Sequence, residues 1–562
     1  MRYGSWDING FNRDSAVRLC QSGINPLVSV FLASRSITET GDARAVIGTD
    51  PVSFHDPFLM ADMDKAVSRI REAVANGEKI AVYGDYDVDG MTASVILAIW
   101  LRLKGADFEV YIPGRFDEGY GLNNAALSEF KARGVGLIVT VDCGITALVE
   151  ARHAKELGLG LVITDHHECR DTLPEADAVV DPKRPDCPYP FKSLSGVGVA
   201  FKLICALEGD YLSEAMFREY SELVAIGTVA DVMPVIDENR ELIRQGLRIL
   251  NDNPRPGIRS LLQEIGVTPG KVTASTISFT IAPRLNAAGR MGQPALSIDI
   301  LLTDSTQEAE KLAVELNRLN TERRSLEIEI SEQATAMLPE EGPAGPVVLA
   351  CESWYQGVTG IVASKMAERY KLPVIIISLA DSVGRGSCRS YGSFSIYDAL
   401  CSCEDILGNY GGHEMAAGIT VAEENIEELR RRVISCYHAK TKDAPPSGLT
   451  VDFEVEKPEL LTLDNIEALE RLEPFGNGNP SPCLCMMGAV ASAIQSIGAG
   501  KHTRLRIRKS GHMLDCVFFS VSAEDLGVSE GELVDVAFEP QINEYRGRSS
   551  VQLQLLDIRS GV

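Results

Sequence analysis

The sequence predicts an α/β protein with two domains built on parallel sheets, a long helix that joins them, and a C-terminal domain of short β-strands. Three observations lead to this class. Short apolar runs alternate with helical stretches over residues 51–250, a segment of helical composition covers 306–338, and alternating apolar and polar residues follow residue 480. Strand, helix and strand at this spacing are typical of a parallel sheet with right-handed crossovers.

The first domain is indicated by three apolar runs that each end in an acidic cluster. Helical stretches lie between or after them, and ligands bind beyond the carboxyl ends of the strands in such sheets. We therefore expect the three acidic clusters to converge. The runs are Ile80–Tyr83, Leu137–Val141 and Leu161–Thr164, with helices near Ala93–Leu103, Ala125–Arg133 and Ala147–Leu157.

The acidic clusters indicate a metal site. Asp85-Tyr-Asp87-Val-Asp89 follows the first run, Asp142 follows the second, and Asp165-His-His167 follows the third. Carboxylates and imidazoles bind divalent ions that promote attack on a phosphate ester. Asp231 is a fourth candidate, because its neighbours are Val, Ala, Met and Pro and an acid is costly to bury there without a partner. It follows Leu223–Ile226, which fits a helix or a strand equally well.

Simpler explanations exist for each residue taken alone. An acid after a strand is more often a turn former or a helix N-cap. That explanation is weak for three carboxylates spaced two residues apart, since they repel one another without a cation. His166 and His167 could form a surface pair, but only 8 His occur in the chain. Two of them beside an acid favour the metal site.

The second domain and its connection follow from composition. Thr306–Leu338 is rich in Glu, Leu, Ala and Arg, with Leu312, Leu316 and Leu319 at helical spacing. It predicts a long helix that ends before Pro339. Two apolar runs then predict strands of a second α/β domain, and the cleft between the two domains would hold the substrate. These runs are Pro346–Ala350 and Val374–Ser378.

Composition places the chain in a broad class. Its 562 residues suffice for three or more domains, and 45% hydrophobic content is that of a globular protein. Residues 1–12 show no signal-peptide pattern, and no apolar run is long enough to predict a membrane span. The 13 Cys are scattered and predict reduced thiols in a cytoplasmic protein. Cys401-Ser-Cys403 and Cys483-Leu-Cys485 lack the usual zinc spacing.

The net charge of −25 argues against a nucleic-acid partner. Binding depends, however, on the local field along a groove, and Lys501–Lys509 is a basic stretch. Its alternation places Arg504, Arg506 and Arg508 on one face of a strand. That pattern fits a solvated β-face as well as a DNA groove. If it is a groove, we expect binding to be sensitive to salt.

A series of motifs runs in order along roughly residues 50 to 560. The segments are Asp56–Met60, Asp85–Gly90, Ile112–Arg115, Gly119–Leu122, Val141–Ile145, Asp165–His167, Gly227–Pro234, Ile281–Met291, Gly357–Ser364, Gly386–Ser390, Gly411–His413 and Glu473–Pro480. Together they resemble the DHH phosphoesterase superfamily, and within it the bacterial exonucleases that degrade single-stranded DNA from 5′ to 3′. The segments from Gly357 to His413 resemble its DHHA1 domain. Glu473–Pro480 resembles the entry to a C-terminal oligonucleotide-binding (OB) β-barrel, which favours a single-strand groove for the basic stretch.

The resemblance implies roles for the acidic clusters. The expected metal ligands are Asp87, Asp89, Asp142, Asp165, His166 and Asp231, and the expected catalytic residues are Asp85, His166, His167 and His413. One position departs from the pattern. Many superfamily members have His four residues before the acid matched by Asp87, and this chain has Tyr83. A neutral phenol is a poor ligand, so we expect Asp85 to take that coordination position.

The resemblance also implies contacts with the DNA strand. Arg115, Ser387 and Arg389 are expected to line a pocket for a 5′ phosphate, because the arginine fork suits phosphate and glycines beside Ser387 let backbone amides approach an anion. Arg389 is expected in a Gly-Ser-Cys-Arg-Ser turn, and Asn286–Gly289 in a tight turn. The alternative for an isolated arginine is a surface salt bridge. Further contacts are expected from Arg284, Asn286 and Arg290, and in the OB domain from Arg504 and Arg506.

The expected function is a metal-dependent 5′→3′ exonuclease that degrades single-stranded DNA to mononucleotides in recombination and repair. Two divalent ions would activate a water and stabilise the attacking and leaving oxygens, and the oxygen-rich ligand set favours Mn²⁺ or Mg²⁺ over Zn²⁺. No P-loop signature is present. The resemblance implies a single-strand-binding protein and a helicase as partners, and no membrane.

The expected domains follow in chain order. They are an N-terminal extension packed on the first domain (1–50), the DHH catalytic domain (51–305), a connecting helix (306–338), the DHHA1 domain (339–441), a linker and lead-in segment (442–480) and the OB-like domain (481–562).

Three rival functions remain at this point. A related phosphodiesterase could act on short oligonucleotides or cyclic dinucleotides, but such substrates need no third domain. A non-catalytic DNA-binding scaffold would not need the intact acids. An inorganic pyrophosphatase would have a similar metal site without the OB-like domain.

Overall fold

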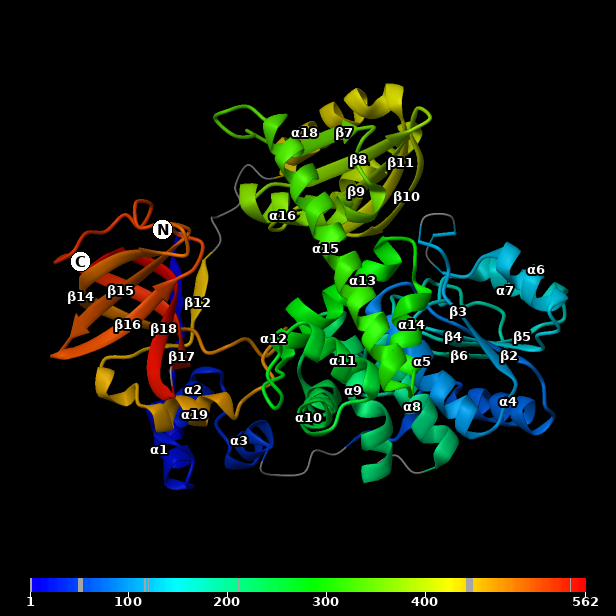
Figure 1. Ribbon diagram of the computed structural model, residues 1–562, viewed down its shortest axis with the longest axis horizontal. Coiled ribbons are helices and arrows are strands. Elements are labelled where there is room, and N and C mark those ends of the chain that lie inside the picture. The colour runs from blue at the N-terminus through cyan, green and yellow to red at the C-terminus, as the bar shows by residue number, and fades with distance from the viewer. Residues whose placement is uncertain are drawn as a thin grey trace. The chain divides into compact units, whose positions relative to one another are not determined.

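The computed structural model describes residues 3–48, 54–115, 118–119, 121–209, 213–440, 448–545 and 547–561. The chain divides into two compact units (Figure 1). One is Phe54–Ala444. The other combines Met1–Ser53 with Pro445–Val562.

A five-stranded parallel sheet organises the first part of unit Phe54–Ala444. Its strand order is β3-β2-β4-β5-β6, and every neighbouring pair is parallel, so the predicted parallel sheet is confirmed. The two faces carry separate apolar cores, with helices α4, α5 and α8 on one and α6 and α7 on the other. The elements are η1 (Pro57–Leu59), α4 (Met63–Ala75), β2 (Ile80–Tyr83), α5 (Val88–Leu103), β3 (Phe108–Tyr111), α6 (Asn124–Ala132), β4 (Leu137–Val141), α7 (Leu148–Glu156), β5 (Gly160–Thr164), β6 (Ala178–Val180) and α8 (Gly196–Glu208).

A group of helices continues this domain. The elements are α9 (Glu214–Ala230), α10 (Asp237–Asp252), α11 (Pro256–Glu264), α12 (Ala274–Thr276), the π-helical turn η2 (Ile277–Ile281), α13 (Ala282–Arg290), α14 (Ala295–Leu302) and α15 (Thr306–Ala336). Leu223–Ile226 therefore lies in a helix. The expected tight turn at Asn286–Gly289 is wrong, because these residues lie inside α13. Gly289 serves close packing: a methyl group added there would lie 3.0 Å from the backbone oxygen of Tyr86.

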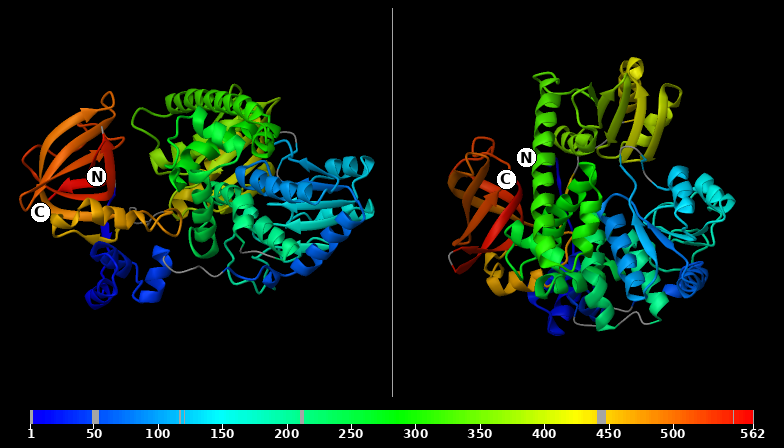
Figure 2. Two further views of the ribbon diagram at one scale, coloured as in Figure 1. Left: turned by 60° about the horizontal axis from the view of Figure 1, so that its bottom comes forward. Right: turned by 45° about the vertical axis from the view of Figure 1, so that its right-hand side comes forward.

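The long helix α15 leads from these helices to a second sheet, as Figure 2 shows. The strand order is β10-β11-β9-β8-β7. The α/β class is confirmed, but this sheet is mixed, because only β7 and β8 are parallel. Asp381 and Ser382, between β8 and β9, both have positive φ, and so short a turn returns the chain antiparallel. The elements are β7 (Val347–Cys351), α16 (Gln356–Tyr370), β8 (Val374–Ala380), β9 (Val383–Arg389), α17 (Ile396–Cys401), η3 (Glu404–Ile406), β10 (Leu407–His413), β11 (Ala416–Ala422), η4 (Glu423–Asn425) and α18 (Ile426–Lys440).

The other unit is built on a closed β-barrel. Strands β14, β15, β16, β18 and β17 pair in sequence, and β14 also pairs with β17 to close the ring, which agrees with the expected OB-like barrel. The predicted alternation holds in β15, where Leu505 and Ile507 are buried between exposed arginines. The elements are β12 (Leu449–Val451), β13 (Phe453–Glu454), η5 (Pro458–Leu460), α19 (Leu463–Glu470), β14 (Leu484–Ile497), β15 (His502–Lys509), β16 (His512–Phe518), β17 (Leu533–Tyr545) and β18 (Arg548–Ser560). Of the expected linker, residues 442–447 lie outside the described residues, as does residue 441 at the end of the expected DHHA1 domain.

The N-terminal segment packs on this barrel unit and not, as expected, on the first domain. Strand β1 pairs in parallel with β12, and Arg35 makes a two-pronged ion pair with Asp452 at 2.8 and 3.0 Å. Trp6 donates a hydrogen bond to the buried Asp557. The elements are β1 (Trp6–Ile8), α1 (Arg13–Gln21), α2 (Pro26–Ser34) and α3 (Thr40–Ile47).

Two further features concern the cysteines and the possibility of membrane-spanning helices. All 13 cysteines are free thiols. Among the helices of the described residues, none combines the length and apolar character needed to cross a bilayer.

Candidate active site

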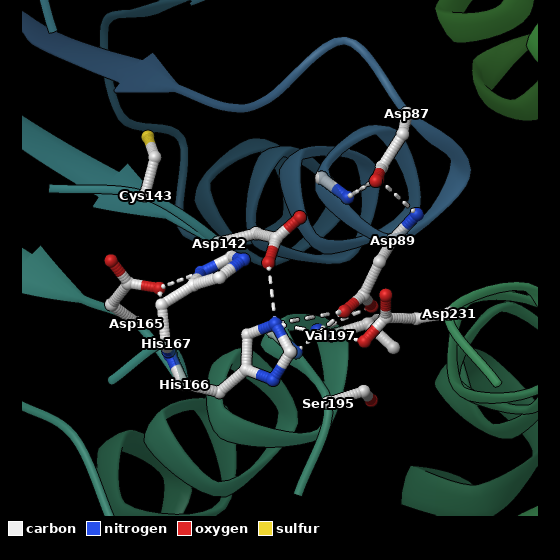
Figure 3. A network of polar contacts seen from close by, with 12 residues as sticks. Asp87, Asp89, Asp142, Cys143, Asp165, His166, His167, Ser195, Val197 and Asp231 are labelled. Atoms are coloured by element: carbon white, nitrogen blue, oxygen red, sulfur yellow. Dashed lines mark hydrogen bonds and ion pairs between the residues drawn. The ribbon is translucent and has the colours of Figure 1, made fainter. Parts of the chain in front are cut away.

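The predicted acidic clusters meet at the carboxyl edge of the parallel sheet, as Figure 3 shows. The ring of His166 lies among three of the acids. Its Nε2 atom lies 3.0 Å from an oxygen of Asp142, 3.7 Å from Asp231 and 3.8 Å from Asp89. Asp231 ends helix α9, so the end of a helix also contributes to the cluster at this edge.

Three overlapping groups of side chains could each hold a cation. Within each group the candidate ligand atoms lie within 4.8 Å of one another. Asp142 belongs to two groups and His166 to two. The groups found among the described residues are Asp142, His166 and His167; Asp89, His166 and Asp231; and Asp85, Asp87 and Asp142. Oxygen donors with one or two imidazoles are the set that suits Mn²⁺ or Mg²⁺.

Helix starts hold two of the acids in place. One oxygen of Asp87 accepts hydrogen bonds from the backbone N–H groups of Asp89 and Gly90, so Asp87 is also the N-cap of α5. The two oxygens of Asp89 accept from Gly196 at 2.6 Å and Val197 at 2.9 Å, the first N–H groups of α8. The positive end of a helix favours a carboxylate there.

Asp142 occupies a strained backbone position. Its φ is 62°, in the left-handed region that non-glycine residues rarely adopt. Its carboxylate lies against the start of α8, where a methyl group added at Gly196 would lie 2.5 Å from the Asp142 oxygen. Strain of this kind persists where the surroundings enforce it, often at functional sites. Here the left-handed backbone of Asp142 directs its carboxylate, which belongs to two of the groups, into the cluster.

The bare cluster is electrostatically unfavourable, which fits a cation site. Burial, and next the neighbouring carboxylates, raise the pKa values of Asp85, Asp89 and Asp142 well above the usual range. The same causes raise the pKa of Asp231 to about 7. Several buried atoms also make no hydrogen bond of good geometry within the described chain, namely Asp85 Oδ1, Asp142 Oδ1 and both ring nitrogens of His166. A divalent cation would coordinate these buried atoms and would also offset the repulsion between the carboxylates.

The two histidines differ in charge. Burial, and then the adjacent His167, lower the pKa of His166 to about 3, so its ring is neutral and able to bind a metal. Burial opposes the charged form of His167 as well. The hydrogen bond from its Nδ1 to Asp165 outweighs that effect, and its pKa rises to about 9.

Asp165 does not belong to any of the three groups, so the geometry does not support its expected role as a ligand. Its Oδ1 accepts from His167 Nδ1 at 2.7 Å and from the backbone N–H groups of His166 and His167. Its Oδ2 accepts from the N–H of Ile145. Both oxygens are thus engaged in orienting the histidine pair.

Tyr83 is not at the cluster. Its ring is buried, and its hydroxyl donates to the backbone oxygen of Gly121 at 2.8 Å. The side-chain amide of Asn123 donates to the same hydroxyl. Asp85, in contrast, joins Asp87 and Asp142 in one group, as expected for the residue that takes the coordination position.

An arginine-lined cavity of about 680 Å³ adjoins the cluster through Tyr86, the residue between Asp85 and Asp87. Arg115, Arg290 and Ser387 line it. Arg389 lies at its wall, since a methyl group added at the lining residue Gly360 would lie 3.3 Å from Arg389 Nη2 and 3.5 Å from Ser387 Oγ. The structure thus brings the expected phosphate residues together.

Three arginines at this cavity have no acidic partner among the described residues. Within the described chain, Arg115, Arg290 and Arg389 make no ion pair with a carboxylate, so the salt-bridge alternative does not apply to them. Burial, and then Arg115 with other arginines, lower the pKa of Arg290 to about 9. Burial lowers the pKa of Arg389 as well. Glu118 also lines the cavity, but the arginines outnumber it, and positive charge gathered in a cavity is a site for an anion.

Arg389 and Ser387 lie in strand β9, so the expected turn is wrong. Gly386 is required by packing across the sheet, because a methyl group there would lie 2.6 Å from the side chain of Ile419. The strand still presents Gly386 and Ser387 to the cavity. Ser387 Oγ lies 3.0 Å from Thr359 Oγ1 on α16.

A second cavity of about 560 Å³ shares Arg290 with the first. It contains Arg284 and Asn286, as expected, and several residues that the sequence did not single out: Phe279, Arg323, Arg324 and Lys365. Phe279 is 79% exposed although it is a large apolar residue. It lies in the π-helical turn η2, a feature often found at functional sites, and no sequence signal distinguished it from a core residue.

Two expectations are not supported by contacts in the structure. His413 ends the edge strand β10, is exposed, and belongs to none of the three groups. Arg504 and Arg506 are exposed on β15 as expected, but both pair with Asp515, at 3.5 and 3.0 Å. Part of that basic face is therefore neutralised within the barrel.

Comparison with known proteins follows the same division of the chain. Residues 79–228 match the DHH family, N-terminal domain, residues 345–439 the DHHA1 domain, and residues 451–557 the RecJ OB domain. A single-stranded-DNA-specific exonuclease RecJ from Bacillus subtilis is 39% identical over 559 residues, which cover 98% of this chain and 70% of that protein.

Two solved structures are also similar. RecJ from Thermus thermophilus in complex with Mn²⁺ matches with a TM-score of 0.86 and 30% identity, over 99% of this chain and 80% of that one. The same protein in complex with Mg²⁺ matches with a TM-score of 0.79 and 28% identity, over 99% and 79%.

Proposed function

The chain belongs to the RecJ family of single-stranded-DNA-specific exonucleases, and we propose that it removes mononucleotides from the 5′ end of single-stranded DNA by two-metal hydrolysis. It is a metal-dependent nuclease. The direction, the product and the number of ions are the proposed part. One observation carries the direction: a cavity lined by Arg115 and Arg290, which make no ion pair with a carboxylate among the described residues, lies directly beside the acid cluster.

The cofactor is Mn²⁺ or Mg²⁺. Asp85, Asp87 and Asp142 would hold one ion, and Asp89, His166 and Asp231 a second. Bound there, the ions would supply Lewis acidity for the attacking water and the leaving oxygen. The neutral ring of His166 fits a ligand of the second ion, and the Asp142 carboxylate, 3.0 Å from His166 Nε2, lies beside that site.

His167 and Asp165 act together beside the ligands. Asp165 fixes the ring through Nδ1, and this hydrogen bond raises the pKa of His167 to about 9. A ring held in this way next to the cluster can donate a hydrogen bond to the negative charge that develops on a phosphate in the transition state.

The arginine-lined cavity would bind the 5′ phosphate. Arg115, Ser387 and Arg389 offer guanidinium and hydroxyl donors there. A phosphate so held sets the end of the strand at a fixed separation from the acid cluster. Cleavage then occurs a fixed number of bonds from the end, which is how an exonuclease releases a product of uniform size.

The second cavity would accept the strand beyond the scissile phosphate. Arg284 and Arg324 provide charge for the phosphates, and Phe279 provides a face for a base. Arginine contacts with an aromatic platform are the usual means of binding a single strand without sequence preference.

The biological setting is inferred from the same family membership. We place the enzyme in the cytoplasm, in DNA recombination and repair, with a single-strand-binding protein and a helicase as partners.

A phosphodiesterase for short oligonucleotides or cyclic dinucleotides remains the second candidate. It would use the same acid cluster. The barrel unit and the second cavity favour the long strand, since a short diester occupies neither.

The test is digestion of a long single-stranded DNA labelled at the 5′ end in one reaction and the 3′ end in another, with Mn²⁺. Mononucleotides should appear at once from the 5′ label only, and Asp142→Asn should abolish them. Early release from the 3′ label would reverse the direction. Cleavage of dinucleotides but not of long DNA would establish the second candidate.

A further inference from the structure

Tyr86 belongs to both halves of the site. It stands between Asp85 and Asp87, two acids of one candidate metal group. Its side chain also lines the arginine-rich cavity. It is the residue through which the cavity adjoins the cluster.

The ring of Tyr86 supports Arg115. The guanidinium carbon of Arg115 lies 4.6 Å from the ring centroid, within the range of a cation–π contact. Arg115 makes no ion pair with a carboxylate in the described chain. A long arginine side chain loses much rotamer freedom when it is ordered, so a face that holds the planar group in advance lowers the cost of binding an anion.

The backbone of Tyr86 is fixed from two sides. Asp87, its neighbour, caps helix α5 through the N–H groups of Asp89 and Gly90. On the other side, α13 packs so closely that a methyl group at Gly289 would lie 3.0 Å from the Tyr86 oxygen. The next residue of α13 is Arg290, which lines the same cavity.

We propose that Tyr86 is a positioning residue for end recognition: its ring holds Arg115 over the cavity and so ties the 5′-phosphate subsite to the metal-binding acids. This proposal rests on the proposed function of that cavity. The aromatic face is what matters, because no hydrogen bond of the Tyr86 hydroxyl is needed for the contact with Arg115.

The test compares kcat/KM for 5′-phosphorylated and 5′-hydroxyl single-stranded DNA. Tyr86→Leu should lower the ratio of the two by roughly 3-fold to 30-fold, the range of a partly buried cation–π contact. Tyr86→Phe keeps the face and should keep the ratio. Tyr86→Met fills a similar volume without a ring and serves if Tyr86→Leu does not fold. The ratio is insensitive to a general loss of active enzyme.

A double-mutant cycle with Arg115→Ala identifies the partner. If Tyr86 acts through Arg115, Tyr86→Leu should not lower the ratio further once Arg115 is absent. Losses that multiply in the double mutant, or an unchanged ratio in Tyr86→Leu and Tyr86→Met, would overturn the proposal and leave the phosphate pocket standing. A wild-type enzyme that cleaves 5′-phosphorylated and 5′-hydroxyl DNA equally well would contradict the assignment of the cavity to the 5′ phosphate, and this proposal with it.

Discussion

The side-chain hydroxyls of Ser195 and Thr228 lie 2.8 Å apart and are both fully buried. Ser195 caps the start of α8, whose next two N–H groups hold the carboxylate of Asp89. Thr228 lies one turn before Asp231 on α9. The hydrogen bond therefore joins the helix that holds one acid of the cluster to the helix that carries another.

Removing this bond should weaken metal binding. Thr228→Val keeps the shape of the side chain but removes the hydroxyl opposite Ser195, which then keeps only the hydrogen bond from the Gly198 N–H, at a cost of about 1–3 kcal/mol in the free energy of unfolding. We expect the apparent Kd for Mn²⁺, measured by calorimetric titration, to rise roughly 3-fold to 10-fold. Ser221→Ala is the matched control, because the Ser221 hydroxyl bonds within its own helix. Equal Mn²⁺ affinities in all three proteins would show that the bond does not position the acids.

Without metal, the stability of this unit should fall as pH rises. The pKa of Asp231 is raised from 3.8 to about 7, and those of Asp85, Asp89 and Asp142 are raised too. A raised carboxyl pKa means that folding takes up protons, so this contribution is full below pH 3.8 and is lost on passing through about pH 7.

Thermal unfolding in EDTA and in Mn²⁺ measures this effect. The gain in Tm from Mn²⁺ should be larger at pH 7.5 than at pH 5, because bound cations replace the lost protons. In Asp231→Asn, the decline of the metal-free Tm between pH 4 and pH 7 should be shallower. A Tm gain that is the same at both pH values would contradict the electrostatic account of the cluster.

Arg389 should govern the preference for phosphorylated ends. Because Arg389 is largely buried and makes no ion pair with a described carboxylate, Arg389→Ala should reduce the kcat/KM ratio of 5′-phosphate to 5′-hydroxyl DNA by roughly 10-fold to 100-fold, the value of a charge-assisted contact. The maximal rate on saturating DNA should change less. Arg369→Ala, an exposed arginine of the same domain that lies over Tyr370, should leave the ratio unchanged. An unchanged ratio in Arg389→Ala would reject its assignment to the phosphate.

Phe279 should contribute to strand affinity. Base stacking on an aromatic side chain is worth about 1–3 kcal/mol, so Phe279→Ala should raise KM for long single-stranded DNA roughly 5-fold to 100-fold with little change in kcat. Val314→Ala removes another exposed apolar side chain outside the cavity and is the control. If both variants bind DNA like the wild type, the strand does not pass over Phe279.

The sequence predicted best what is local. Apolar runs fixed β2 and β4 at their observed ends, because a buried parallel strand needs a continuous apolar segment. Acids that follow parallel strands must share one edge of the sheet, so the order of strands and acids along the chain was enough to predict the cluster. The mixed second sheet depended on a two-residue turn, whose effect on strand direction no apolar pattern shows.

Glycines were a less reliable guide. Gly289 and Gly386 suggested turns, yet one lies in a helix and the other in a strand. In both places the missing side chain makes room for a neighbour distant in sequence, the Tyr86 backbone or Ile419. Such requirements depend on the tertiary structure, and in the sequence a glycine needed for packing cannot be distinguished from a glycine needed for a turn.

Long-range pairing was likewise invisible to sequence patterns. The strand β1 and Arg35 contact residues near position 450, and no local pattern specifies a partner so far along the chain. The same limit explains Asp165. Whether a buried acid binds metal or orients a histidine depends on which N–H groups the fold brings to it.

The most direct test of the account is to count the Mn²⁺ ions bound per chain at equilibrium, in the preparation used for DNA digestion. Asp85, Asp87 and Asp142 would hold one ion and Asp89, His166 and Asp231 the other, so the wild type should bind two ions, and Asp142→Asn should bind fewer and fail to digest single-stranded DNA. Full digestion by a protein that holds one ion or none, or by Asp142→Asn, would contradict two-metal hydrolysis at this cluster.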